Sequence, residues 1–387
     1  MNRILYIVFA FSALSNQLFA QTNNEANKAA NYNNSVGNVN LEMANPTLDV
    51  RSSGYFKKEA DEFEAQAKQT PSSAQAWLNY YKSSLYSFYT SSSKTLTTQQ
   101  KEELTDILAE MKAKVPASFE YNLAVYLNGQ HNTNLIGYLA NAAEMNSNNI
   151  DVVEQYVAYY AITNNDSKLK EYVSKHRKLS KYESFIDEYG YNLLQSLESN
   201  AVLFTHGVLD TYPLYNQQLA QKVNVGVEII NIDYLNSEEF RKNISKKLGV
   251  TFSYTGNNYA TAFEIASKLK SSRGIYFSNA FSKTELKKHE KELDLSGLAL
   301  KFSDNKTDVS NIVSLWTTKF KKTEVEKVAM TDDYAKKMAN NYLPTLITVY
   351  KYYTTENKTK EATAVKNLAI KIAKVNGNEK QVNDLFN

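Results

Sequence analysis

The sequence contains no cysteine, which excludes disulfide bonds, thiolate metal sites, a cysteine nucleophile and a cysteine-linked lipid anchor. Histidine is scarce as well. The four histidines are dispersed along the chain, and no two have the His-x-x-x-His spacing that places a pair of metal ligands on one helix face. We therefore expect neither a metal ion nor a cofactor.

Charge of one sign and long apolar runs are also missing. The chain has 44 Lys and Arg residues against 41 Asp and Glu residues, a formal net charge of +3. Nucleic-acid binding needs clustered basic charge, so we expect no nucleic-acid partner. Beyond the N-terminal twenty residues no apolar run approaches the roughly 18 residues of a transmembrane helix. The mature chain should therefore carry no membrane span.

Local catalytic motifs are absent from the sequence. The segment between Gly249 and Gly256 lacks the Lys and Ser/Thr spacing of a phosphate-binding loop, and no Gly-x-Ser-x-Gly occurs. We accordingly expect a protein that is not an enzyme.

The N-terminus has the layout of an exported protein. Arg3 precedes an apolar run that ends at Leu14, and Ala20 is a small residue at a plausible cleavage point. Residues 1–20 are thus predicted to be a signal peptide for export to the periplasm. Residues 21–50 are rich in Asn and poor in large apolar side chains, so they are predicted to form a flexible tail.

Residues 51–198 show helical periodicity and an internal repeat. A shift of 34 residues places the apolar positions of one segment on those of the next: Phe119 on Val153, Leu123 on Val157 and Tyr126 on Tyr160. A unit of helix, tight turn and helix at this period resembles a tetratricopeptide (TPR) repeat. Such hairpins bury their apolar faces by stacking, and the stack leaves a concave groove.

Tyrosine is the abundant residue, with 28 copies. Several lie on the first helices of the predicted hairpins, which line the groove in TPR folds. Most should be packing residues, whereas a minority would be exposed to a protein partner. The candidates for partner contact are Tyr80, Tyr126, Tyr156 and Tyr160.

Residues 199–305 change to alternating apolar strands and helices. The predicted strands are residues 201–205, 227–232, 274–279 and 298–303. This alternation favours a small parallel-sheet α/β module. Residues 306–387 again have helical periodicity and predict C-terminal helical hairpins. The expected fold class is α-rich α/β, with TPR-like hairpins flanking the module.

Ligands of parallel sheets bind at the carboxyl ends of strands. The polar residues predicted at those ends are His206, Asp210, Asp233 and Asn279. In one interpretation His206 and Asp210 form an acid–base pair. In the other, which we favour, Asp210 and Thr211 cap a helix that begins near Pro213, and His206 packs in a turn.

Several stretches carry a family resemblance, in this order along the chain: VLFTHGVLDTYPLYNQQLAQKVNVGVEIINIDYLNS, RGIYFSNAF, DLSGLALKF, NIVSLWTTKF and the helical stretch ending LPTLITVYKYY. They resemble the soluble C-terminal region of bacterial multi-spanning membrane proteins known as O-mannosyltransferase-like, over residues 199–355. The resemblance implies a shared fold and compartment. In that family the loop after the first strand is richer in Asp and Asn, where this chain has His206, Val208 and Leu209. The resemblance therefore implies no transferred activity.

These observations lead to one functional hypothesis and two alternatives. We expect a periplasmic, non-enzymatic interaction subunit that presents a Tyr-rich surface to a protein partner in the cell envelope, such as an outer-membrane protein complex or secretion translocon, as accessory subunit or plug. The first alternative is a glycan- or nucleotide-sugar-related enzyme or ligand-binding protein that uses the α/β crevice. The second is a periplasmic spacer without a defined groove.

Overall fold

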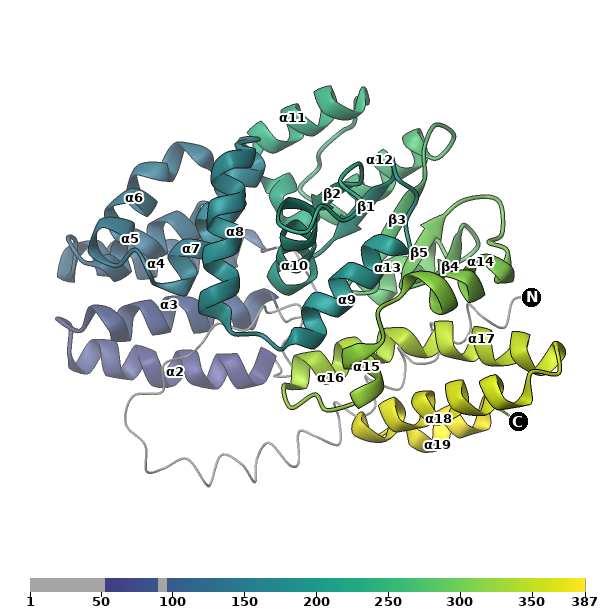
Figure 1. Cartoon of the computed structure of the whole chain (residues 1–387). Helices are drawn as coiled ribbons and strands as arrows, with labels where there is room; N and C mark the ends of the chain where they lie inside the picture. The colour runs from purple at the N-terminus through teal and green to yellow at the C-terminus, as the bar shows by residue number, and fades with distance from the viewer. Residues whose placement is uncertain (1–52, 90–95, 387) are drawn as a thin grey trace.

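The computed structural model describes residues 53–89 and 96–386 (Figure 1). The predicted signal peptide and Asn-rich tail lie outside these residues. In the described ranges, no helix combines the length and apolar character needed to cross a bilayer.

The N-terminal region consists of helices that pair along the chain (Figure 1). They are α2 (Ser53–Gln69), α3 (Ala74–Tyr89), α4 (Thr98–Lys114), α5 (Phe119–Asn128), η1 (Thr133–Leu135), α6 (Ile136–Met145), α7 (Ile150–Ile162), α8 (Asp166–Ser180) and α9 (Ser184–Gln195). Helix α2 packs on α3, α5 on α6 and α7 on α8. These pairs confirm the predicted helical hairpins, while a relation to TPR repeats stays a prediction.

Side-chain caps explain where several of these helices begin. Thr97 and Gln100 form a reciprocal capping box at α4, and the Ser118 hydroxyl accepts a hydrogen bond from the Tyr121 N–H at α5. At α7 the Asn149 side chain accepts from the backbone N–H groups of the first turn. Each cap follows a polar break in the sequence.

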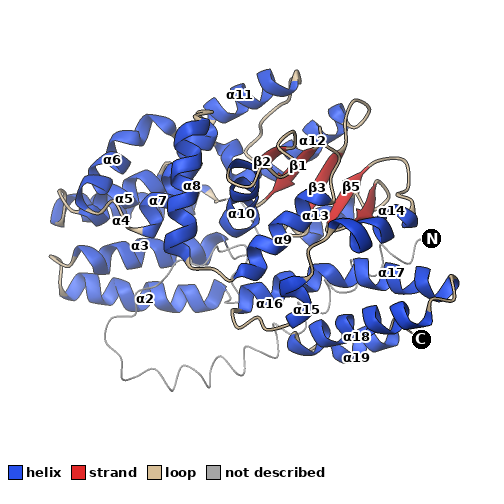
Figure 2. Cartoon of the chain, in the orientation of Figure 1, coloured by secondary structure: helices blue, strands red, loops and turns tan. Residues whose placement is uncertain are grey.

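The α/β module contains a five-stranded sheet (red in Figure 2) in the order β2-β1-β3-β5-β4. Its strands are β1 (Val202–Thr205), β2 (Glu228–Asn231), β3 (Ile275–Ser278), β4 (Leu293–Ser296) and β5 (Ala299–Phe302). β1 pairs in parallel with β2 and β3, but β5 is antiparallel to both β3 and β4. The sheet is therefore mixed: the predicted parallel pairing is confirmed for β1, β2 and β3 and was wrong for β5, which is antiparallel.

A tight hairpin causes this reversal. β4 and β5 are joined at Gly297, whose φ of +61° favours glycine, and a Cβ there would lie 2.3 Å from the Ser196 hydroxyl. A connection this short can join only antiparallel strands. The predicted strand at 298–303 is β5, whereas β4 was not predicted.

The helices of the module are α10 (Val208–Leu219), η2 (Ile232–Asn236), α11 (Glu238–Leu248), α12 (Asn258–Leu269) and α13 (Lys283–Lys288). Helix α10 begins five residues before the predicted start near Pro213. Gly207 is its N-cap, with a φ of +83°. The stretch Val208-Leu209 is therefore helical and not a turn.

The C-terminal region is α14 (Val309–Ser314), the π-helical turn η3 (Leu315–Lys319), α15 (Thr323–Lys327), α16 (Asp333–Ala339), η4 (Asn340–Tyr342), α17 (Leu343–Thr355), α18 (Thr359–Val375) and α19 (Glu379–Asp384). Helices α17 and α18 form the predicted hairpin and lie side by side in Figure 1.

Two clusters of buried apolar side chains form the core. One extends from Ala67 of α2 to Val152 of α7 and holds α2 to α7 together. The other begins at Val157 and reaches Phe386, so that it joins α7 to α9, the sheet and the C-terminal helices. Helix α7 contributes to both clusters. The fold class, α-rich α/β, is confirmed, and the domain boundaries stay predictions.

Candidate functional site

The polar residues predicted at the strand ends meet at one place in the sheet. From β1 the chain passes to β2 on one side and then crosses to β3 on the other. The carboxyl ends of β1 and β3 therefore form a topological switch point, the usual ligand site of such sheets. Five side chains lie here, and we call them the histidine cluster: His206, Asp210, Asp233, Tyr259 and Ser278.

Both ring nitrogens of His206 are engaged. Nε2 lies 3.1 Å from Oδ1 of Asp233, and Nδ1 lies 3.0 Å from the Tyr259 hydroxyl. The side chain is 8% exposed. A general base needs a nitrogen lone pair that faces the substrate, and neither nitrogen is free to do so. The interpretation of His206 and Asp210 as an acid–base pair was wrong, because the His206 ring binds Asp233.

Asp210 organises the backbone around the N-terminus of α10. Its Oδ2 accepts hydrogen bonds from the His206 backbone N–H at 2.9 Å and from the Ser278 hydroxyl at 2.5 Å. Burial raises the pKa of Asp210 to about 6, although these two hydrogen bonds oppose the rise. Asp210 and Thr211 lie inside α10, whose N-cap is Gly207, so neither residue caps the helix as the favoured interpretation predicted.

Asp233 occupies the position where a helix N-terminus binds an anion. Its Oδ2 accepts a hydrogen bond from the backbone N–H of Gly207, the N-cap of α10, at 3.0 Å. Burial raises the pKa of Asp233, but the nearby His206, His131 and Gly207 N–H outweigh it, so the net shift is downward. The protein's own carboxylate thus fills the anion position of this switch point.

Asn279, the residue after β3, has a structural role. Its amide Nδ2 donates a hydrogen bond to the Leu298 carbonyl at 3.1 Å and thereby ties the end of β3 to the β4–β5 hairpin. Across the described residues, no group of three His, Asp or Glu side chains could hold a metal ion.

Sequence reasoning missed two members of the histidine cluster. Ser278 is the last residue of β3, so the rule that placed Asn279 at the sheet edge could have included it. Tyr259 lies in the first turn of α12, which reaches the cluster from elsewhere in the chain. No local signal connects Tyr259 with His206.

A second group of side chains lies on the α7–α8 hairpin, and we call it the tyrosine cluster. Its members are Tyr156, Tyr159 and Tyr160 from α7 and Tyr172 from α8. The rings of Tyr156 and Tyr160 stack with centroids 5.7 Å apart, and Tyr172 lies 4.8 Å from Tyr156. All four are part-buried, and their hydroxyls bond to no other described side chain or backbone group.

The hydroxyls of Tyr156, Tyr160 and Tyr172 stay protonated at neutral pH. Burial, followed by the neighbouring Tyr172 and Tyr160, raises the pKa of Tyr156 to about 12. Burial also raises the pKa values of Tyr160 and Tyr172. The cluster therefore presents ring surface together with hydroxyl groups that can donate or accept hydrogen bonds.

Two of the four predicted partner-binding tyrosines do not belong to this cluster. Tyr126 is 1% exposed and packs in the N-terminal core, so it offers no surface to a partner. Tyr80 lies on α3 beside Trp77, at a ring distance of 6.4 Å, and interacts with Glu64 of α2. The structure brings Tyr156 and Tyr160 together and separates them from Tyr80. Tyr172, which was not predicted, completes the group.

Comparison with known families gives one finding. Residues 186–345 match the family model described as TMEM260-associated domain 2. The matched region begins in α9, contains the whole sheet and the histidine cluster, and ends in α17. It coincides with most of the stretch in which the sequence showed a family resemblance. A search of curated proteins found no match.

Proposed function

We propose that this chain is a non-enzymatic interaction subunit of the cell envelope that binds a membrane protein through the tyrosine cluster. The observation that carries the proposal is the contiguous set of four part-buried tyrosines on one hairpin. Tyrosine is enriched at protein interfaces because its ring supplies apolar area and its hydroxyl supplies a hydrogen bond.

The state of the histidine cluster supports an interaction role over catalysis. His206 has no unengaged ring nitrogen, and Asp233 takes the anion position at α10. A substrate at this switch point would have to displace hydrogen bonds that stabilise the fold. The alternative of an enzyme that uses the α/β crevice is thus less favoured by the geometry.

The proposal that the partner is a membrane protein rests on two similarities. The matched region carries a description that associates it with TMEM260. The same stretch resembles the soluble part of multi-spanning O-mannosyltransferase-like proteins. We propose that the module has the fold of that soluble part and works beside a separate membrane protein, with TPR-like hairpins providing the contact surface. Export to the periplasm belongs to the same proposal.

Affinity purification from detergent-solubilised envelope tests this function. The tagged wild-type chain should recover a membrane protein in stoichiometric amount. The double variant Tyr156→Ala/Tyr160→Ala should lose most of that partner because the stacked pair at the centre of the cluster is gone. Melting temperatures of the variants establish that they are folded.

Tyr352→Ala is the matched control, since Tyr352 is part-buried on α17 in the opposite half of the chain. It should recover the partner as the wild type does. Equal recovery by all three proteins would contradict a binding role for the tyrosine cluster, and recovery of the wild type only as a free monomer would contradict the interaction role itself. A spacer would lose stability in the double variant but no partner.

A further inference from the structure

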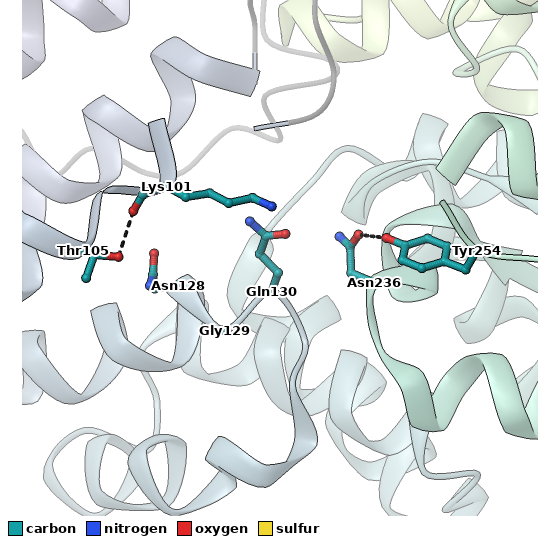
Figure 3. Close-up of a pocket in the computed structure, with 7 residues that line it drawn as sticks. All are labelled: Lys101, Thr105, Asn128, Gly129, Gln130, Asn236 and Tyr254. Atoms are coloured by element: carbon teal, nitrogen blue, oxygen red, sulfur yellow. Dashed lines mark hydrogen bonds between the residues drawn. The ribbon is translucent and has the colours of Figure 1, made fainter. Parts of the chain in front are cut away.

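A polar pocket lies where the N-terminal helices meet the α/β module. Figure 3 shows that Lys101 and Thr105 of α4 and Asn128, the last residue of α5, line one side, Gln130 after α5 lies at the centre, and Asn236 and Tyr254 of the α/β module form the other side. Its volume is about 300 Å³, at the lower end of the range for small-molecule sites. It is separate from both the histidine cluster and the tyrosine cluster.

The groups that line this pocket match a hydroxylated ligand. The Gln130 carboxamide has both donor and acceptor atoms, whereas Oδ1 of Asn128 and Oδ1 of Asn236 already accept hydrogen bonds from the Tyr81 and Tyr254 hydroxyls, so these two residues offer their amide donors. Sugar and polyol hydroxyls both donate and accept, so they can accept from all three carboxamides and donate to that of Gln130. None of the lining residues is acidic. The Lys101 side chain extends toward Gln130, and among the described residues its ammonium forms no ion pair. A negatively charged group on the ligand would neutralise it.

The module side of the pocket is held in place. The Tyr254 hydroxyl donates to Oδ1 of Asn236 at 2.8 Å, and the Arg241 guanidinium lies 4.1 Å from the centre of the Tyr254 ring. Because Oδ1 of Asn236 is engaged in this way, its amide nitrogen faces Gln130 across the pocket (Figure 3). A rigid wall reduces the entropy that a ligand must overcome on binding.

The backbone that presents Gln130 is strained. Gln130 and His131 are consecutive non-glycine residues in the left-handed region, with φ values of +46° and +66°. That conformation costs about 1–2 kcal/mol per residue and persists where the surroundings impose it. Here the His131 ring packs edge-on against Tyr234 at 5.1 Å, and Thr133 donates a hydrogen bond to Glu239 at 2.7 Å. Contacts with the α/β module thus hold the loop that aims Gln130 into the pocket.

We infer that this pocket binds a small hydroxyl-rich carboxylate of the sugar-acid type. The ligand carboxylate pairs with the Lys101 ammonium, its hydroxyls bond to the carboxamides of Gln130, Asn128 and Asn236, and its C–H face lies against Tyr254. Because the two walls come from α4–α5 and from the α/β module, a bound ligand bridges the two parts of the fold.

Saturation-transfer NMR and calorimetry with D-glucuronate test the inference on the full mature chain. D-glucose serves as the neutral counterpart and acetate as the carboxylate without hydroxyls. We expect wild-type protein to bind glucuronate, with glucose and acetate each weaker by about tenfold or more, since each lacks one of the two recognised features. Lys101→Gln should weaken glucuronate binding by about tenfold and leave glucose binding unchanged.

The control is Lys112→Gln, because Lys112 is an exposed lysine on the same helix, away from the pocket. It should bind glucuronate as the wild type does. Gln130→Ala removes the carboxamide at the centre of the pocket and should weaken binding of both sugars. The inference is overturned if the wild type binds none of the probes, if acetate binds as well as glucuronate, or if Lys101→Gln and Gln130→Ala both bind glucuronate normally while their melting temperatures match the wild type.

Discussion

The histidine cluster and the tyrosine cluster are both groups of aromatic and polar side chains, but they differ in what their polar atoms do. Within the histidine cluster, the ring nitrogens of His206 and Oδ2 of Asp210 are bonded to other parts of the chain. In the tyrosine cluster the rings contact one another while their hydroxyls are available. Buried polar groups that are fully paired specify a fold, whereas part-buried groups with unused bonding capacity are suited to binding a partner.

The largest effect that separates the two clusters should come from His206→Ala. The change leaves the Asp233 carboxylate and the Tyr259 hydroxyl without their partner and opens a cavity, which together should lower the free energy of unfolding by about 3–4 kcal/mol. Urea denaturation measures it. Tyr172→Ala is the counterpart in the tyrosine cluster and should cost about 1 kcal/mol. Equal losses for the two variants would remove the distinction between the clusters.

The second-largest effect should be the contribution of Asp210 to the pH dependence of stability. Its pKa is raised from 3.8 to about 6 in the folded protein, so between about pH 4 and pH 6 the folded state binds a proton that the unfolded state has released. Stability therefore falls as pH rises through this window, by roughly 3 kcal/mol. Below the window the carboxyl group is protonated in both states, and above it the loss is complete.

Asp210→Asn tests this prediction, because asparagine keeps the shape and an acceptor oxygen but does not titrate. Urea denaturation at pH 4, 5, 6 and 7 should show that wild type loses stability relative to the variant as pH rises. A difference between the two proteins that is constant across the four pH values would show that Asp210 is not held with a raised pKa.

The smallest effect concerns single hydroxyl groups. Tyr259→Phe removes the hydrogen bond to Nδ1 of His206 and should cost about 1 kcal/mol. Tyr160→Phe removes a hydroxyl without an internal partner and should change stability by less than about 0.5 kcal/mol. Thermal denaturation of the pair compares them directly, and a larger loss from Tyr160→Phe would mean that the tyrosine cluster is a structural network after all.

Element positions were largely predictable where periodicity was strong. The helical periodicity after residue 306 predicted hairpins, and α18 (Thr359–Val375) forms one of them, since its apolar stripe is regular and Gly377 follows it. β4 was missed because it has only four residues, two of them apolar, and directly follows a charged stretch. Its pairing depends on β5, and thus on a contact that no local pattern shows.

The location of the histidine cluster could be predicted from the sequence, but its hydrogen-bond partners could not. Strand-end reasoning brought His206, Asp210 and Asp233 to one edge. Which carboxylate faces the ring depends on the start of α10 at Gly207, and a left-handed N-cap leaves little signal beyond a single glycine.

The exposure of individual tyrosines could not be predicted from the repeat. Tyr126 and Tyr160 are equivalent in the 34-residue repeat, but Tyr126 lies near Tyr156 and Tyr159 of the next hairpin and is buried, whereas Tyr160 is only part-buried. Repeat position therefore does not determine exposure, because each hairpin is covered by a different neighbour.

Photo-crosslinking in intact cells tests directly whether the tyrosine cluster contacts a membrane protein. Benzoylphenylalanine would replace Tyr160 in one protein and Tyr352 in another, and the products would be identified by mass spectrometry. The proposed contact predicts that a single envelope membrane protein is crosslinked at position 160 and not at position 352. Crosslinks of equal yield at both positions, or none at position 160 from a folded chain, would contradict it.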